Sequence, residues 1–158
     1  MMPANPIQIL RQCARWDPVF PLSFHELQDV IARILEALGY DDAALTLKLV
    51  DDVEIARLNS EFLGCFGPTN VLSFPAREQE GEDGDGYLGE IALSVDTLAR
   101  EVDLYGQDPV EHLVRLLAHA ILHLAGFDHG EVMDSLTETA VDAFRDGDFD
   151  QEGLHAQA

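Results

Sequence analysis

The chain has few basic residues. Its 158 residues include 9 lysines and arginines against 30 aspartates and glutamates, a formal net charge of −21. Affinity for nucleic acids normally comes from lysine and arginine side chains that displace the counterions condensed on phosphates. A surface of this sign favours solubility and repels polyanions. The composition therefore argues against tight, independent binding to RNA or DNA.

Cysteines and long hydrophobic runs are also scarce. Cys13 and Cys65 are too few for a disulfide framework and lack the spacing of a metal site. No stretch approaches the roughly 20 apolar residues that cross a bilayer. The N-terminus lacks the basic start and the sustained apolar run of a signal peptide. We therefore expect two unpaired thiols and a cytoplasmic protein that makes no membrane contact.

What remains is the composition of an ordinary globular protein, with a hydrophobic fraction of 47%. The length suits one domain around one core, and the sequence shows neither a repeat nor a dividing linker. We expect a single domain over residues 1–158, with its core at about residues 7–145 and a frayed tail at residues 146–158.

Alternating segments predict four strands, and capped amphipathic segments predict five helices. The strands are expected at residues 7–12, 45–49, 70–74 and 87–95, and the helices at 24–38, 52–62, 96–105, 109–125 and 132–144. Ser23 with Glu26 forms a capping-box pattern, Asp51 or Asp52 can cap the second helix, and Asp108 precedes Pro109 at the fourth. Strands and helices interleave without a regular βαβ rhythm, which favours an α+β fold with one mixed sheet.

An acidic, glycine-rich segment, REQEGEDGDG at residues 77–86, separates the third and fourth predicted strands. It contains no apolar side chain whose burial would order it, so its composition predicts a mobile surface loop. The two strands that it joins are expected to form an antiparallel pair.

Three histidines are placed to meet at the end of the fourth predicted helix. His119 and His123 are four residues apart, and a helix therefore stacks them on one face. Gly126 then lets the backbone leave the helix in a left-handed conformation, which turns His129 toward the same point. Three imidazoles suit zinc and leave a fourth position for water or substrate. We predict a catalytic site with one zinc ion per chain, bound by His119, His123 and His129.

The same spacing occurs in the long zinc-protease motif H-E-x-x-H-x-x-G-x-x-H. In those enzymes the glutamate after the first histidine is the general base, and this chain has Ala120 there. Asp128 is the only acid inside the motif. A metallopeptidase is therefore disfavoured. His112, two turns before His119, is interpreted as a histidine of an amphipathic helix face in preference to a group that contacts a metal ligand.

The histidine segment also resembles the signature of a known family. His119-x3-His123-Leu124-x-Gly126-Phe127-Asp128-His129 resembles HGxLHLxGYDH, the approximate motif of the bacterial rRNA maturation endoribonucleases of the YbeY type. Leu58-Asn59, Gly64 and PTNVLSFP at residues 68–75 resemble the family's LNxxYRGxxxPTDVLSFP block, and Leu88-Gly89-Glu90-Ile91 resembles its LGDI strand. The matches stand in the family's order and span about residues 43–145.

The resemblance implies a small metal-dependent hydrolase that cleaves single-stranded RNA and helps to mature small-subunit rRNA in ribosome biogenesis. It also implies an α+β fold with three histidine ligands on one zinc. The partners would be single-stranded rRNA and the small ribosomal subunit, with no DNA and no membrane. The anionic composition fits this implication if the ribosome supplies much of the affinity.

Three positions depart from the family pattern. Leu63 stands where the family usually has a functionally important arginine, so a natural phosphate clamp beside an open zinc site is missing. Ala120 replaces a glycine, which is a mild change on a helix. Glu90 replaces an aspartate and keeps its charge with a longer reach. Leu63 and the net charge of −21 favour an alternative: a metal-containing ribosome-assembly binding protein with weakened catalysis.

Two acids are candidates for the surroundings of the metal. A carboxylate beside zinc often orients a ligand imidazole, and Asp128 or Glu90 can serve in this way. Alternatively, Asp128 caps the turn after the helix and Glu90 is an ordinary acid of a strand face. Zinc would lower the pKa of its water from about 15.7 toward about 7 and polarise the scissile phosphate. Metal-bound hydroxide and a neighbouring 2′-OH both stay open as the nucleophile.

Overall fold

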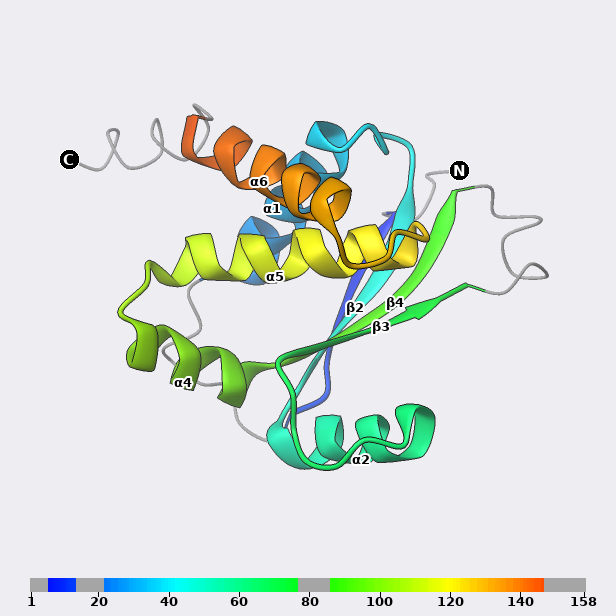
Figure 1. Cartoon of the computed structure of the whole chain (residues 1–158), viewed down its shortest axis with the longest axis vertical. Helices are drawn as coiled ribbons and strands as arrows, with labels where there is room; N and C mark the ends of the chain where they lie inside the picture. Colours follow the sequence, from blue (N-terminus) through cyan, green and yellow to red (C-terminus); the bar gives the residue numbers. More distant parts are fainter. Residues whose placement is uncertain (1–5, 14–21, 77–85, 147–158) are drawn as a thin grey trace.

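The computed structural model describes residues 6–13, 22–76 and 86–146 (Figure 1). One mixed sheet has the strand order β1-β2-β4-β3. Its strands are β1 (Ile7–Arg11), β2 (Ala44–Val50), β3 (Val71–Pro75) and β4 (Tyr87–Ser94). Strands β1 and β4 pair parallel with β2, and β3 pairs antiparallel with β4, as predicted. Of the loop predicted between β3 and β4, residues 77–85 lie outside the described residues, and so do residues 147–158 of the predicted tail.

The described residues form five helices, which confirms the predicted α+β fold. They are α1 (Phe24–Ala37), α2 (Asp52–Leu63), α4 (Val95–Tyr105), α5 (Pro109–Leu124) and α6 (Glu131–Asp146). Ser23 caps α1 in a reciprocal box, because its hydroxyl accepts from the Glu26 amide and the Glu26 carboxylate accepts from the Ser23 amide. Asp51 caps α2 and Asp108 caps α5. Element ends differ from the predicted ones by at most two residues.

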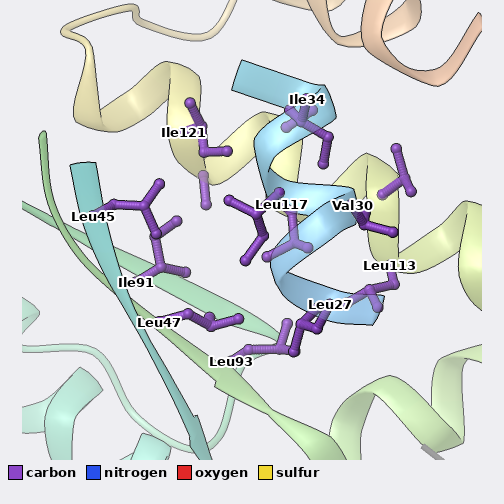
Figure 2. Packing of buried hydrophobic residues seen from close by; sticks show 14 of the residues in the cluster. Leu27, Val30, Ile34, Leu45, Leu47, Ile91, Leu93, Leu113, Leu117 and Ile121 are labelled. Carbon is purple, nitrogen blue, oxygen red and sulfur yellow. The ribbon is translucent and has the colours of Figure 1, made fainter. Parts of the chain in front are cut away.

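The main core lies between the sheet and the helices α1, α5 and α6 (Figures 1 and 2). Alternate residues of the central strands point toward α1 and α5, among them Leu47 of β2 and Ile91 and Leu93 of β4, and all three are buried. Leu117 of α5 meets them from the helical side. Because successive strand residues face opposite sides, the intervening side chains point toward α2. The sheet thus separates an α5 side from an α2 side.

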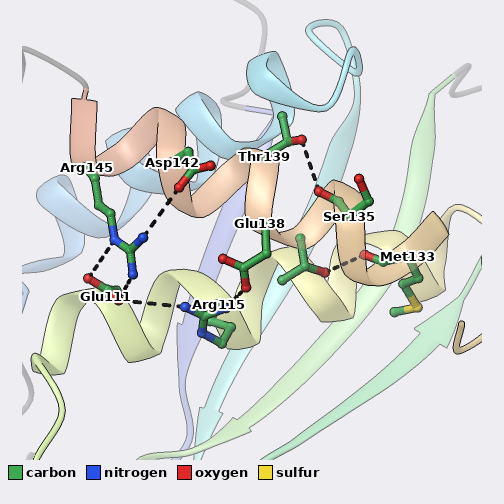
Figure 3. A network of polar contacts seen from close by, with 9 residues as sticks. Glu111, Arg115, Met133, Ser135, Glu138, Thr139, Asp142 and Arg145 are labelled. Atoms are coloured by element: carbon green, nitrogen blue, oxygen red, sulfur yellow. Dashed lines mark hydrogen bonds and ion pairs between the residues drawn. The ribbon is translucent and has the colours of Figure 1, made fainter. Parts of the chain in front are cut away.

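Helix α6 is held along α5 by apolar and polar contacts. Met133, Ala140 and Val141 are buried, and the polar contacts are shown in Figure 3. Arg145 of α6 donates to Glu111 of α5, and this guanidinium keeps the pKa of the Glu111 carboxyl below its usual value. Exposed ion pairs contribute only about 0.2–1 kcal/mol each, so the apolar burial dominates. The packing of α6 on α5 fixes the turn between them, which carries His129.

The start of α2 is tied to the end of β4 and to α4 by the Asp52 carboxylate. It accepts hydrogen bonds from Ser94 and Thr97 at 2.7 Å each and from Arg100 at 2.7 Å. Burial opposes ionisation of this carboxyl, but the three hydrogen bonds outweigh that effect and lower the pKa of Asp52. This anchor sets the position of α2 against the sheet.

Gly89 of β4 is a position where the fold needs glycine. Its φ is +137°, and an added Cβ would lie 2.3 Å from the carbonyl oxygen of Phe74. Strained backbone and overpacking each cost about 1–3 kcal/mol, so Gly89→Ala is expected to lower the free energy of unfolding by about 3 kcal/mol in urea denaturation. Gly106→Ala is the control, since Gly106 also has a positive φ but nothing lies within 4 Å of its added Cβ. Equal losses in both variants would contradict the close-approach argument.

Candidate metal centre

The three predicted ligands come together at the C-terminal end of α5. His119 and His123 lie one helical turn apart, with ring centroids 4.7 Å apart. The helix ends at Leu124, and Gly126 has a φ of +100°, which is the predicted turn out of the helix. His129 then lies with its ring centroid 5.1 Å from that of His119 and 4.7 Å from that of His123.

The geometry of these donors fits one metal ion. One ligand atom from each histidine lies within 4.8 Å of the other two. Nitrogens bound to a tetrahedral zinc at about 2.0–2.1 Å are about 3.3 Å apart, so small side-chain movements would close the set around an ion. Three neutral nitrogen donors with a fourth position left open are the donor set of zinc centres that act on a substrate. The predicted grouping of His119, His123 and His129 is present.

A backbone carbonyl orients one of the three rings. Nδ1 of His123 lies 3.2 Å from the carbonyl oxygen of Phe127, and it can only donate to this acceptor. Nε2 of His123 is therefore the nitrogen left to bind a metal. Asp128 is exposed, and within the described part of the chain its carboxylate accepts no hydrogen bond. The Phe127 carbonyl thus orients the ring of His123. This is the role that was considered for Asp128.

The surroundings of His119 favour the uncharged form of its imidazole. Burial lowers the pKa of the His119 imidazole, and His123 and His129 lower it further, while Asp134 raises it. Metal binding requires the neutral imidazole, so a lowered pKa favours coordination.

Asp134 is a residue of this site that the sequence analysis missed. It lies in the first turn of α6, and its amide donates to the Gly130 carbonyl at 2.9 Å. Its negative charge acts on His119 of the neighbouring helix. The only sequence signal is an acid five residues after His129. That spacing alone does not place Asp134 near His119, because its position depends on the packing of α6 on α5.

Glu90 is not brought to the three histidines. Ile91 belongs to the core below α5, so its neighbour Glu90 faces the opposite side of the sheet. There the Glu90 carboxylate pairs with Lys48 at 3.0 Å. His112 is buried against α4, where its Nε2 lies 2.8 Å from the Glu101 carboxylate. Seven residues along a helix correspond to about 10.5 Å, so His112 stays away from the metal ligands.

The position of the family's arginine is at the end of α2. Leu63 is the last residue of that helix, and 56% of it is exposed. Two arginines, Arg57 and Arg77, lie near this position in the sequence. Arg57 of α2 is paired with both Glu54 and Glu61. The other, Arg77, lies outside the described residues. The structure therefore shows no unpaired guanidinium at this end of α2 within its described part.

Fold and site together define the class: an α+β domain with a candidate three-histidine metal centre at a helix end. Sequence comparison then gives the family. The family model described as "Endoribonuclease YbeY" matches residues 20–141. The chain is 45% identical over 138 residues to Endoribonuclease YbeY of Oleidesulfovibrio alaskensis, covering 76% of this chain and 82% of that protein. It is 41% identical over 138 residues to that of Nitratidesulfovibrio vulgaris, covering 78% and 85%. The chain belongs to the Endoribonuclease YbeY family.

A solved structure supports the fold. The solution structure of a Thermotoga maritima protein, TM1509, superposes with a TM-score of 0.59 at 26% identity, covering 86% of this chain and 87% of that one. Among the described residues, none of the helices has the length and apolar character needed to span a membrane.

Proposed function

We propose that this chain is an endoribonuclease that cleaves single-stranded RNA with one zinc ion held by His119, His123 and His129. The observation that carries the proposal is the convergence of these three side chains in a member of a family whose relatives are named endoribonucleases. Its substrate would be rRNA of the small ribosomal subunit during maturation, in the cytoplasm.

The residues of the site support this chemistry. The Phe127 carbonyl holds His123 in the tautomer that presents Nε2, and burial lowers the pKa of His119, which favours its neutral form. Bound zinc would supply a Lewis acid that polarises a phosphate oxygen and activates a water or hydroxyl nucleophile. The exposed side chain of His129 completes the donor set at the open edge, which leaves room for a polymeric substrate.

A second candidate is a metal-containing ribosome-assembly binding protein with weakened catalysis. It is favoured by Leu63 at the end of α2 and by the engagement of Arg57 with two glutamates. A metallopeptidase stays disfavoured. The position that would need a general-base glutamate holds Ala120, a fully buried residue of α5.

One assay separates these functions. The purified chain with zinc is offered single-stranded RNA, duplex RNA and a peptide library, with His119→Ala as the control. We expect cleavage of single-stranded RNA alone, and none by the variant. Peptide cleavage would contradict the proposal in favour of a peptidase, and RNA binding without cleavage would favour the assembly protein.

A further inference from the structure

A groove lies on the α2 side of the sheet, on the face opposite the core under α5. Its volume is about 440 Å³, and it is lined by residues of α2, β2, β3 and β4. Small-ligand sites usually occupy about 300–1,000 Å³, so a single nucleobase or a similar group can enter. We call this cavity the α2 groove and define it by Phe62, Phe74, Tyr87, Lys48 and Glu90.

The α2 groove has an aromatic wall. Phe62 lies at the end of α2 with 59% of its surface exposed, although a large apolar side chain gains free energy from burial. Phe74 of β3 supports it in an edge-to-face contact, with ring centroids 5.5 Å apart at 69°. Single-stranded RNA is recognised by unpaired bases that stack on such aromatic side chains and form hydrogen bonds along their edges.

The sheet side of the groove carries a donor next to acceptors. Nζ of Lys48 lies 3.0 Å from Oε1 of Glu90, and the two side chains are 29% and 42% exposed. An ammonium group only donates hydrogen bonds and a carboxylate only accepts them. A ligand that matches this pair presents one acceptor beside two adjacent donors.

Among the four RNA bases, guanine has this pattern on its Watson–Crick edge. Its O6 accepts, and the neighbouring N1–H and N2–H both donate. Adenine and cytosine offer one amino group there, and uracil offers one N–H between two carbonyls. Carboxylates are established acceptors for base amino groups, and lysine is an established donor to guanine O6.

We propose that the α2 groove binds an unpaired guanine of the RNA. The base stacks on Phe62, its O6 accepts from Lys48, and its N1–H and N2–H donate to Glu90. This inference rests on the proposed function, since it takes RNA as the substrate class. It gives the site a base preference that the three histidines alone do not provide.

The position of β3 connects the groove with the metal centre. The Ser73 hydroxyl donates to the Ala120 carbonyl of α5 at 3.1 Å, so Ser73 faces the helix that carries the histidines. The next residue, Phe74, lines the groove on the other face. Since β3 is the last strand of the sheet, a single RNA strand that crosses this edge can place its guanine in the groove and a phosphate near His119.

The charge of the chain gives a reason for such a contact. With a net charge of −21, phosphate neutralisation contributes little to RNA affinity. Stacking and edge hydrogen bonds contribute without releasing counterions. Guanine binding in the α2 groove should therefore depend only weakly on salt concentration.

The test measures binding separately from cleavage. Fluorescence anisotropy follows the zinc-loaded chain with labelled uridine heptamers that carry guanine, adenine, cytosine or inosine at the centre, and a gel checks that the RNA is intact. We expect the guanine heptamer to bind about tenfold more tightly than those with adenine or cytosine. Inosine lacks the N2 amino group and should lie between them.

Two variants assign the preference to the groove. Glu90→Gln is expected to remove the guanine preference, measured as the ratio of the affinities for the guanine heptamer and an all-uridine heptamer. Phe62→Ala is expected to weaken the guanine heptamer by about tenfold through lost stacking. Val53→Ala is the matched control, because Val53 is an exposed residue of α2 that does not line the groove. Circular dichroism confirms that each variant is folded.

Equal affinity for the four heptamers, or a guanine preference that survives Glu90→Gln, would overturn the guanine site. A cleavage assay on the same RNAs tests the proposed function independently. Cleavage without guanine preference would support the endoribonuclease and remove the guanine site. Guanine-selective binding without cleavage would support the site and contradict the enzyme.

Discussion

We expect that changing both His119 and His123 to alanine will abolish metal binding and RNA cleavage. The wild-type chain should purify with about one zinc per chain, because three converging imidazoles are a donor set that suits zinc. Two of the three donors are then missing, and His129 alone does not retain the ion. Elemental analysis of the purified proteins measures the change.

The same variant gives a second readout in thermal stability. A ligand that binds only the folded state stabilises it by roughly 2.7 kcal/mol when its free concentration is 100 times the dissociation constant. Added zinc should therefore raise the melting temperature of the wild type and leave that of the double variant unchanged. His25→Ala is the control, since His25 is an exposed residue of α1. Unchanged zinc content in the double variant would contradict the proposal that His119, His123 and His129 bind the ion.

Replacing Leu63 with arginine is expected to raise the rate of RNA cleavage by about tenfold to a hundredfold. A hydrogen bond to a charged group contributes roughly 1.5–3 kcal/mol, and the family's arginine can make such a contact with a phosphate. The position accepts the change, because Leu63 is more than half exposed and a cation is favoured at the C-terminal end of a helix. The measurement is the initial rate on one single-stranded RNA at fixed zinc and salt.

Leu63→Gln is the matched control, because glutamine brings a polar side chain without the charge. Only the arginine variant should show a gain that shrinks as the salt concentration rises, since phosphate contacts are salt-sensitive. If the wild type cleaves no RNA and Leu63→Arg restores no cleavage, the endoribonuclease proposal fails. The assembly-protein alternative would then take its place.

Local patterns in the sequence were enough to predict most of the secondary structure. Ser23 with Glu26 and Asp108 with Pro109 predicted the starts of α1 and α5, because these side chains hydrogen-bond to amides three residues away. The grouping of the three histidines was also predictable from local sequence. Two of them share one helix face and the third follows a helix-ending glycine, so all their spacing lies within eleven residues of the chain.

Long-range packing decided the rest. The sequence made Glu90 a strand residue, but alternation gives two faces without saying which helix covers each of them. Only the packing of α5 on one face and α2 on the other placed Glu90 with Lys48 and away from the histidines. Asp134 was missed for the same physical reason, since its charge acts on His119 only because α6 packs along α5.

The sequence by itself determined the elements, the three candidate metal ligands and the family motifs, because each depends on residues close together in the chain. The tertiary structure alone decided which acid acts on His119 and where the α2 groove opens. Those features depend on side chains far apart in the sequence, such as Phe62 and Glu90, and their positions are set by the burial of apolar faces between helices and sheet.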